Sequence, residues 1–419
     1  MIVDPLAALM TYGRIQATPS RFSGRRTFER WQDARLQRWL WRRAARVPAF
    51  RGRIGPNTRL AELPVMDKAT LMANFAAYNV AGLDADTVRA AIARDRRVGP
   101  WHVGHSTGTS GNRGLYVLSD RDRFNWLGAI LAKALPDFWR RRARIAVILP
   151  TATGLYDAAH GFGPMQLSFL DLTAGPEHWL GPLIAFRPTV VIAPPKILRH
   201  LAEAAPERLA PDLLYSGAEV MDPLDRSTIR AAFPRARLGE IYMATEGLIA
   251  VTCRAGRLHL CEDAMHVDLE EAGAGLVRPV LTDFSRQAQV MLRYRMNDLL
   301  RMDDSPCACG SPLRGVGEVV GREDDCLILP GGAEVTPDVV RNAVVDADPR
   351  ISDFRVVQAG DGIYVSLPRD VPAAALQRAE AALSARLSAL AGRAVPIMAT
   401  AADLPLMTGR KLRRVERRS

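Results

Sequence analysis

Two short, almost wholly apolar runs constrain the fold of this chain most strongly. They cover residues 145–149 and 189–193, and helical patterns near 122–135, 195–206 and 223–233 alternate with them. A strand that is buried on both faces has such a continuous apolar run, and strands that alternate with helices belong to a parallel sheet. We therefore expect an α/β fold built on a parallel sheet.

Composition excludes several classes of protein. The chain has 419 residues, of which 48% are hydrophobic and 24% are charged, so it is not disordered, collagen-like or a disulfide scaffold. No run approaches the eighteen consecutive apolar residues of a membrane span. The first residues lack a charged segment followed by an apolar one, so we expect no signal peptide and a cytoplasmic location.

The net charge of +11 is carried mainly by arginine. Only Lys68, Lys133, Lys196 and Lys411 are lysines among 56 basic residues, and this points to a compositional bias of the genome. Twelve arginines fall between Arg14 and Arg53. We interpret this cluster as a solvated helix face, and the alternative is attraction of polyanionic small molecules such as nucleotides. We expect no nucleic-acid partner.

A loop rich in glycine and hydroxyl residues covers residues 105–114, with the sequence HSTGTSGNRG. Its glycines permit tight turns, and its side chains supply donors to anionic oxygens, so it suits a polyphosphate. It lacks the spacing of a Walker loop and that of a Rossmann fingerprint. The alternative is an ordinary Ser/Gly surface loop.

Five later segments follow this loop in a fixed order. They are SGAE at 216–219, YMATE at 242–246, YRMNDL at 294–299, GREDD at 321–325 and a basic segment at 405–415. Together with the loop they resemble the motifs of adenylate-forming enzymes. The chain is most similar to the phenylacetate–CoA ligase-like branch, which shares PVMDK at 64–68 and a Cys-x-Cys-Gly element at 307–310.

The resemblance implies how ATP would be bound. Ser106, Thr109 and Ser110 suit the β- and γ-phosphates, and Tyr242 offers a flat ring for adenine. Asp298 suits the ribose hydroxyls, with Arg322 nearby as a donor. The remaining ATP-binding candidates are Thr107, Gly108 and Gly111 of the loop and Ser216, Gly217, Ala218 and Glu219 of the adenine wall.

The catalytic candidates are Glu246, Thr245 and Lys411. Glu246 suits Mg²⁺, and Thr245 suits the α-phosphate. Taken singly, a Thr-Glu pair after a strand is commonly a helix cap, and an Asp after Tyr-Arg is commonly part of a surface salt bridge. The joint order of the motifs favours the catalytic interpretation. The family has glycine where this chain has Asn297, and we expect Asn297 to retain the left-handed turn.

The basic segment near the C-terminus leaves its register open. Counting from Gly409 selects Arg410 as the catalytic cation, whereas counting back from the Arg414-Val415 pair selects Lys411. We choose Lys411, because it is the one lysine after Lys196 in an arginine-rich chain. The alternative is a solvated basic tail.

The cysteines predict a metal site. All five lie between Cys253 and Cys326, and Cys253, His259, Cys307 and Cys309 form a Cys₃His set that suits structural zinc. The spacing resembles the zinc element of the same ligase branch. The alternatives are buried free cysteines or competition from Cys261, and we assign Cys326 to the core.

These observations predict an α/β protein with a large N-terminal adenylation domain over residues 1–322 and a small α+β domain over residues 323–419. The resemblance implies that the small domain is mobile and rotates about Asp324, with Gly332 on the thiol route. A substrate pocket is expected at His160, Gly161, Phe162, Gly163, Met243 and Ala244.

We predict an ATP-dependent acid–thiol ligase that uses ATP, Mg²⁺ and CoA, contains structural Zn²⁺ and acts on a small carboxylic acid, by analogy an aryl acid. The main alternative acceptors are a carrier protein, an amine or another nucleophile. A different class of protein, a non-catalytic nucleotide- or nucleic-acid-binding protein, is the second alternative. A homodimer stays open.

Overall fold

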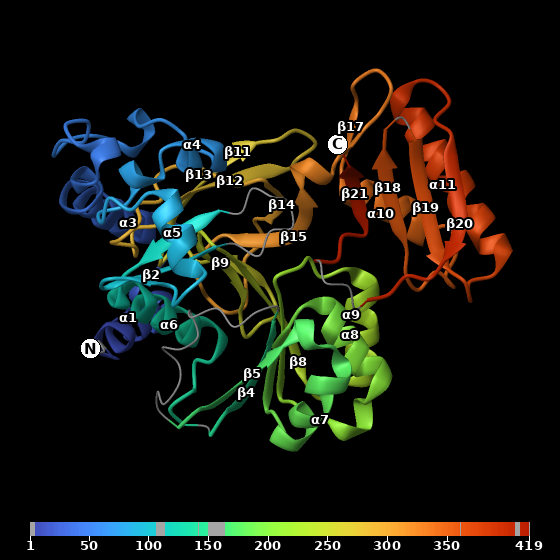
Figure 1. Ribbon diagram of the computed structural model, residues 1–419, viewed down its shortest axis with the longest axis horizontal. Helices are drawn as coiled ribbons and strands as arrows, with labels where there is room; N and C mark the ends of the chain where they lie inside the picture. Colours follow the sequence, from blue (N-terminus) through green and yellow to red (C-terminus); the bar gives the residue numbers. More distant parts are fainter. Residues whose placement is uncertain are drawn as a thin grey trace.

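The structure is a computed structural model. It describes residues 5–105, 114–140, 142–149, 164–360, 362–406 and 411–418. Among these residues, a twelve-stranded sheet runs through the large domain in the order β11-β12-β14-β15-β10-β9-β8-β7-β6-β4-β5, and β13 pairs with β12. Figure 1 shows this sheet to the left of the small C-terminal domain. The predicted α/β fold class is confirmed.

One half of the sheet is parallel, as the apolar runs predict. Its strands are β4 (Arg144–Leu149), β5 (Gln166–Asp171), β6 (Val190–Ala193), β7 (Leu213–Gly217) and β8 (Arg237–Ala244). In β4, Ile145 and Val147 face α1 (Pro5–Gln16) and α6 (Asp120–Ala134), whereas Ala146 and Ile148 face the opposite helical layer. That layer consists of α7 (Pro176–Phe186), α8 (Pro195–Ala204) and α9 (Pro223–Ala232). Burial on both faces explains the continuous apolar run.

The other half of the sheet is antiparallel, which the sequence pattern did not predict. Its strands are β9 (Gly247–Thr252), β10 (Leu258–Leu260), β11 (His266–Glu271), β12 (Val277–Thr282), β13 (Tyr294–Arg295), β14 (Asp298–Asp303) and β15 (Gly315–Arg322). A second core lies against it, to which β2 (Trp101–His105), β3 (Leu115–Leu118) and α5 (Ala85–Ile92) contribute. A short β1 (Arg97–Val98) pairs with β2.

The N-terminal helices follow the predicted pattern with shifted ends. The helix expected over residues 27–47 is α3 (Arg25–Arg42), because Arg43 leaves helical geometry and a 3₁₀ turn, η1 (Ala44–Arg46), follows. This break buries Ala44 and Val47 in the local core. Asp67 caps α4 (Lys68–Ala73) by accepting a hydrogen bond from the Thr70 amide at 2.8 Å, as predicted. The other short helices are α2 (Thr18–Arg21), η2 (Pro48–Phe50), η3 (Leu60–Glu62), η4 (Phe75–Tyr78), η6 (Leu172–Ala174) and η7 (Pro206–Arg208).

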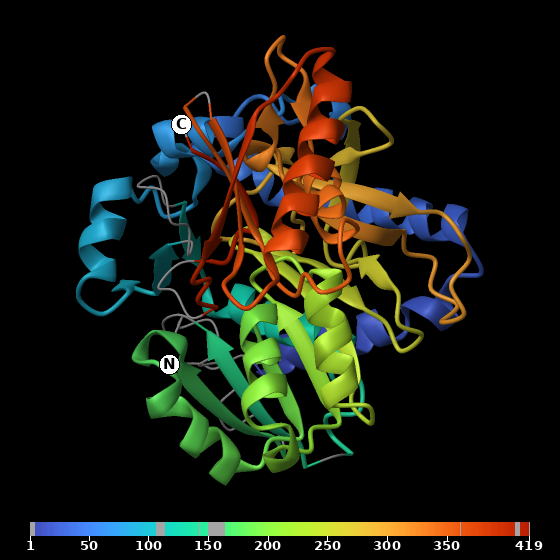
Figure 2. The same cartoon turned by 90° about the vertical axis from the view of Figure 1, so that its right-hand side faces the viewer.

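The C-terminal residues form their own sheet and their own hydrophobic core. After η8 (Glu323–Asp325) come β16 (Leu327–Ile328), β17 (Glu334–Val335), α10 (Pro337–Val345), β18 (Arg355–Ala359), β19 (Gly362–Pro368), α11 (Ala373–Ala391), β20 (Ile397–Ala402) and β21 (Val415–Arg418). The sheet order is β20-β19-β18-β21. The predicted domain boundary at residue 322 coincides with the end of β15. In Figure 2 this domain lies above the helices of the parallel half.

Candidate active site

Thr245 and Glu246 occupy the tight turn between β8 and β9. The two strands pair antiparallel up to Ala244 and Gly247, so the two residues between them form the turn itself. The guanidinium of Arg286 donates a hydrogen bond to the Thr245 carbonyl oxygen and lies 3.2 Å from Asp283, which stabilises the turn from behind. The turn therefore presents a hydroxyl and a carboxylate at the end of the central strand, beside the half-buried Met243 and Ala244.

Tyr242 and Asp298 form a direct contact next to this turn. The Tyr242 hydroxyl donates to Asp298 Oδ2 at 2.6 Å, and Asp298 is the register partner of Arg322 across β14 and β15. Burial raises the pKa of the Asp298 carboxyl, although the Tyr242 hydrogen bond and the charges of Arg322 and Lys411 oppose the shift. Burial and the Asp298 charge raise the pKa of the Tyr242 hydroxyl well above its usual value. Tyr242 is thus a neutral donor that fixes the carboxylate.

Glu246 has two further neighbours, Tyr294 and Lys68. Burial, together with the charge and hydrogen bond of Glu246, raises the pKa of the Tyr294 hydroxyl. Burial lowers the pKa of the Lys68 ammonium, and the nearby carboxylate of Glu246 opposes this shift. Glu246 is therefore flanked by a phenol and a cation, which keep its carboxylate oriented in the turn.

The segment 216–219 leaves β7 through a strained backbone. Ala218 has φ of +68°, a left-handed conformation that is costly for a residue with a side chain. The next residue, Glu219, has a side chain that is only 4% exposed, and its Oε1 lies 3.3 Å from the ammonium of Lys196. Lys196 is itself almost fully buried, at the start of α8. Ser216, also buried, has a hydroxyl without a hydrogen-bond partner among the described residues.

Lys411 of the small domain lies near Glu219. The backbone amide of Leu412 donates to Glu219 Oε1 at 2.9 Å, which docks the segment onto the large domain. Burial lowers the pKa of the Lys411 ammonium, while the charges of Glu219 and Asp298 raise it and that of Arg322 lowers it. The cation thus lies among the carboxylates of Glu219 and Asp298. Sequence reasoning predicted these three residues separately, and the fold brings them together.

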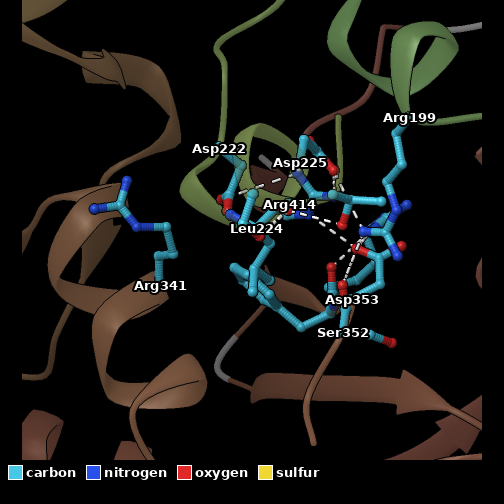
Figure 3. A network of polar contacts seen from close by, with 12 residues as sticks. Arg199, Asp222, Leu224, Asp225, Arg341, Ser352, Asp353 and Arg414 are labelled. Atoms are coloured by element: carbon cyan, nitrogen blue, oxygen red, sulfur yellow. Dashed lines mark hydrogen bonds and ion pairs between the residues drawn. The ribbon is translucent and has the colours of Figure 1, made fainter. Parts of the chain in front are cut away.

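A second contact between the domains is shown in Figure 3. Arg414 donates two hydrogen bonds to Asp225 of α9, at 2.7 and 2.9 Å, and a third to Asp353 at 2.8 Å. Arg199 of α8 lies 3.3 Å from Asp225 and donates to the Ser352 carbonyl oxygen at 2.8 Å. Because Arg414 is three residues from Lys411, this network positions the lysine segment at the site.

Asp324 and Gly332 belong to the segment that follows β15. The Asn297 side-chain amide donates to the exposed Asp324 carboxylate, and Arg322 lies 3.4 Å from it. Asn297 is not among the residues with positive φ, so the expectation of a left-handed turn there is wrong; the side-chain contact takes its place. Gly332 has φ of +85° in the exposed turn between β16 and β17, and its role in thiol access stays a prediction.

Several predicted site residues lie outside the described residues. They are Ser106, Thr107, Gly108, Thr109, Ser110 and Gly111 of the phosphate loop, His160, Gly161, Phe162 and Gly163 of the substrate pocket, and Arg410. The roles proposed for them stay predictions.

The predicted metal ligands form a compact cluster. Cys253 follows β9, His259 lies in β10, and Cys307 and Cys309 belong to the loop between β14 and β15; their ligand atoms all lie within 4.8 Å of one another. The sulfurs of Cys253 and Cys307 are 3.7 Å apart, and Cys309 Sγ is 3.5 Å from His259 Nε2. Tetrahedral zinc with bonds of about 2.3 Å to sulfur and about 2.0 Å to nitrogen requires separations of about 3.8 and 3.5 Å.

The surroundings of the cluster also fit a metal. His259 Nδ1 lies 2.9 Å from the Leu313 carbonyl oxygen, and a proton on Nδ1 leaves Nε2 free to act as a ligand. Cys261 lies outside the cluster, and burial raises the pKa of its thiol to about 12. Cys326 packs in a small core with Leu276 and Leu299, as expected.

Sequence reasoning missed four residues of this site. Lys68, Lys196, Tyr294 and Arg286 contact or face the predicted catalytic groups, yet none received a role. The available signal was the rarity of lysine, because Lys68, Lys196 and Lys411, three of the four lysines, converge on this site.

The chain is similar in sequence to two curated phenylacetate–coenzyme A ligases. It is 25% identical over 195 residues to the one from Thermus thermophilus and 25% identical over 252 residues to the one from Pseudomonas putida. These matches cover 42% and 54% of this chain, and they span about half the length of the relatives, 43% and 55%. No family model matches the chain.

Solved structures match far more of the chain. A 2-hydroxyisobutyryl-CoA ligase in the postadenylation state, with an adenylate bound, has a TM-score of 0.67 at 18% identity and covers 92% of this chain and 89% of its own. The chain therefore shares the overall fold of this CoA ligase. The same ligase with CoA in the thioesterification state has a TM-score of 0.57 at 20% identity, covering 93% and 89%. An anthranilate–CoA ligase with its adenylate has a TM-score of 0.52 at 15% identity and covers 72% of this chain and 63% of its own.

Proposed function

We propose that this protein activates a carboxylic acid with ATP and transfers the acyl group to CoA. A carboxylate oxygen attacks the α-phosphorus, the bond to the β-phosphate breaks, and acyl-adenylate and pyrophosphate form. The CoA thiol then loses its proton and attacks the acyl carbon, and AMP leaves. The observation that carries the proposal is Lys411, held among Glu219, Asp298 and Arg322 at the end of the central strands.

Each residue has a defined task in the first half-reaction. Lys411 neutralises the charge shared by the attacking carboxylate and the α-phosphate. Glu246 would hold Mg²⁺, because its carboxylate is the hard oxygen donor that this cation prefers, and the ion would offset phosphate charge. Asp298, fixed by Tyr242, accepts hydrogen bonds from the ribose. The Thr245 hydroxyl contacts the α-phosphate.

Glu219 and Lys196 keep the charge of the site balanced. If the small domain rotates, Glu219 loses the Leu412 amide and the charge of Lys411, but the buried Lys196 ammonium stays 3.3 Å away. A buried carboxylate without a partner would be strongly destabilised, so Lys196 permits the movement. We therefore assign Lys196 as a positioning residue for the lysine segment.

Lys411→Ala tests the proposed function. The variant should release pyrophosphate at least about a hundredfold more slowly, the loss typical of one electrostatic element, with a panel of aryl and short- to medium-chain acids. It should still convert supplied acyl-adenylate and CoA into thioester, because the lysine serves only the first step. If Arg410→Ala abolishes pyrophosphate release and Lys411→Ala does not, the register is wrong by one residue. Absence of pyrophosphate release from the wild type with every acid would contradict the proposed function.

We further propose that Cys253, His259, Cys307 and Cys309 bind one structural Zn²⁺, which joins the loop after β9 to the loop before β15. Metal analysis of the purified protein should find about one zinc per chain. Cys307→Ser should lose the metal and unfold at lower denaturant concentration, whereas the matched Cys326→Ser outside the cluster should retain the metal. A metal-free protein of full stability would refute the site.

The cytoplasmic location, the homodimer and a carrier-protein acceptor stay predictions. No helix in the described part of the chain is long and apolar enough to cross a membrane.

A further inference from the structure

A cavity of about 450 Å³ lies beside the N-terminal helix, and four arginines line it. Arg14 comes from α1, Arg21 from the end of α2, Arg35 from α3 and Arg121 from the first turn of α6. The side chains of Asn125 and Ser285 add polar groups to the lining. We call this feature the arginine cavity. It shares no described lining residue with the site of Lys411 and Glu246.

The charges in the arginine cavity are only partly compensated, because the Asp263 charge acts on Arg14 alone among the four. Within the part of the chain that the structure describes, no carboxylate forms an ion pair with any of the four arginines. Arg25, on the same helix as Arg35, shows the contrast, because it pairs with Glu29 at 2.8 Å and with Glu262 at 2.6 Å. The convergence of four cations from separate helices without an ion-paired carboxylate among the described residues is thus a local property of the cavity.

Two of the arginines show the cost of this arrangement. Burial, together with the charges of Arg35 and Arg21, lowers the pKa of the Arg14 guanidinium to about 10, although the Asp263 charge opposes the shift. Arg14 also donates a hydrogen bond to the Asp263 carbonyl oxygen. The Nε of Arg35 is buried without a hydrogen-bond partner among the described residues, and its guanidinium lies 5.3 Å from the ring centroid of Phe284 and 5.8 Å from that of Trp31. The two aromatic rings hold the Arg35 guanidinium in place, but they supply no carbonyl or carboxylate oxygen to accept hydrogen bonds from its N–H groups.

We propose that the arginine cavity binds a phosphate group. A phosphate offers several acceptor oxygens and negative charge, and the planar guanidinium fork matches it in a bidentate geometry. The volume accommodates an anion of this size with a small organic substituent. The group can come from free phosphate or pyrophosphate, or from a lipid headgroup, since Leu6 and Met10 of α1 are each 63% exposed beside the cavity. The proposal does not depend on the activity proposed above.

The experiment compares two double variants of the full chain that remove the same charge. Arg21→Gln with Arg121→Gln changes two exposed cavity residues, whereas Arg26→Gln with Arg30→Gln changes two exposed residues of α3 outside the cavity. Inorganic phosphate and pyrophosphate are titrated calorimetrically into each protein. The cavity variant should lose about tenfold or more in affinity for one site, and the control should bind as the wild type does. Thermal unfolding without ligand checks that both variants are folded.

A second arm identifies the source of the phosphate group. Co-sedimentation is measured with vesicles of phosphatidylcholine alone and with added phosphatidylglycerol. Retention on anionic vesicles that the cavity variant loses, without binding of the free anions, assigns a lipid headgroup; the reverse result assigns a free anion. The proposal is overturned if neither probe binds, or if the control variant loses as much affinity as the cavity variant.

Discussion

Two groups of arginines in this protein, each with a largely buried member, have opposite electrostatic properties. At the domain interface Arg414 is surrounded by Asp225 and Asp353, and their hydrogen bonds and charges outweigh burial and raise the pKa of its guanidinium. In the arginine cavity, burial and neighbouring cations lower the pKa of Arg14 and outweigh the Asp263 charge, which reaches Arg14 without an ion pair. Burial is similar in the two places, so the partner decides the sign of the shift. A paired arginine stabilises a contact, whereas an unpaired cluster is prepared for a ligand.

The largest expected effect concerns the paired arginine, Arg414, at the domain interface. Asp225→Asn preserves shape but leaves Arg414 buried with a weaker partner, and loss of a partner in a buried ion pair costs about 3–5 kcal/mol. We expect the free energy of unfolding to fall by an amount in this range, as measured with urea, and docking of the small domain to weaken. Glu203→Gln is the matched control, because Glu203 pairs with Arg199 at 2.7 Å but is 44% exposed, and its loss should cost about 1 kcal/mol or less. Equal losses in the free energy of unfolding of the two variants would contradict the conclusion that burial makes the Asp225 ion pair the stronger one.

A smaller effect concerns the cation of the active site. Burial lowers the pKa of Lys411 and the Glu219 charge raises it, so Glu219→Gln should lower it further. In the proposed function the first half-reaction requires the protonated lysine, so its rate should fall as pH rises through this pKa. The alkaline limb of pyrophosphate release should therefore move to lower pH in Glu219→Gln. Glu240→Gln serves as the control, because Glu240 forms a half-buried ion pair with Arg226 and does not act on Lys411. An unchanged alkaline limb would show that Lys411 does not depend on Glu219.

The smallest expected effect concerns charge repulsion in the arginine cavity. Arg121→Gln removes one like charge from the arginine cavity, so in phosphate-free buffer of low ionic strength the free energy of unfolding should rise by about 0.5 kcal/mol or less. Added sodium chloride should reduce the difference, because salt screens the repulsion. Arg30→Gln, outside the cavity, should not show this stabilisation. A destabilised Arg121→Gln protein would mean that an anionic group already compensates the cavity.

The sequence predicted the parallel half of the sheet better than the antiparallel half. Residues 145–149 and 189–193 are buried on both faces, so their apolar runs are unambiguous, and β4 and β6 lie there. Strands such as β14, with the sequence DLLRMD, alternate less clearly and carry charged residues that the fold pairs, as Arg301 with Asp338 at 2.9 Å. Those charges are satisfied by distant segments, and a local pattern contains no information about them.

The candidate site also contains residues that the sequence predicted and residues that it missed. The order of the motifs predicts Glu219, Tyr242, Glu246, Asp298 and Lys411 as site residues, because each has the chemistry that the proposed adenylation requires. Lys68 and Lys196 were not selected, because their neighbours come from segments far away in the chain. The same limit applies to Asn297, whose side chain contacts Asp324 instead of forming the expected left-handed turn.

By itself the sequence determined the α/β class, the resemblance to adenylate-forming enzymes and the chemistry of the metal ligands, because these depend on local apolar patterns and on residue types in a fixed order. Only the tertiary structure decided which charges have partners. The arginines of residues 14–53 look alike in the sequence, yet Arg25 reaches Glu262 across 237 residues, whereas Arg35 meets aromatic rings and no carboxylate among the described residues. Charge interactions depend on distance in space and on burial, and neither is fixed until distant segments pack together.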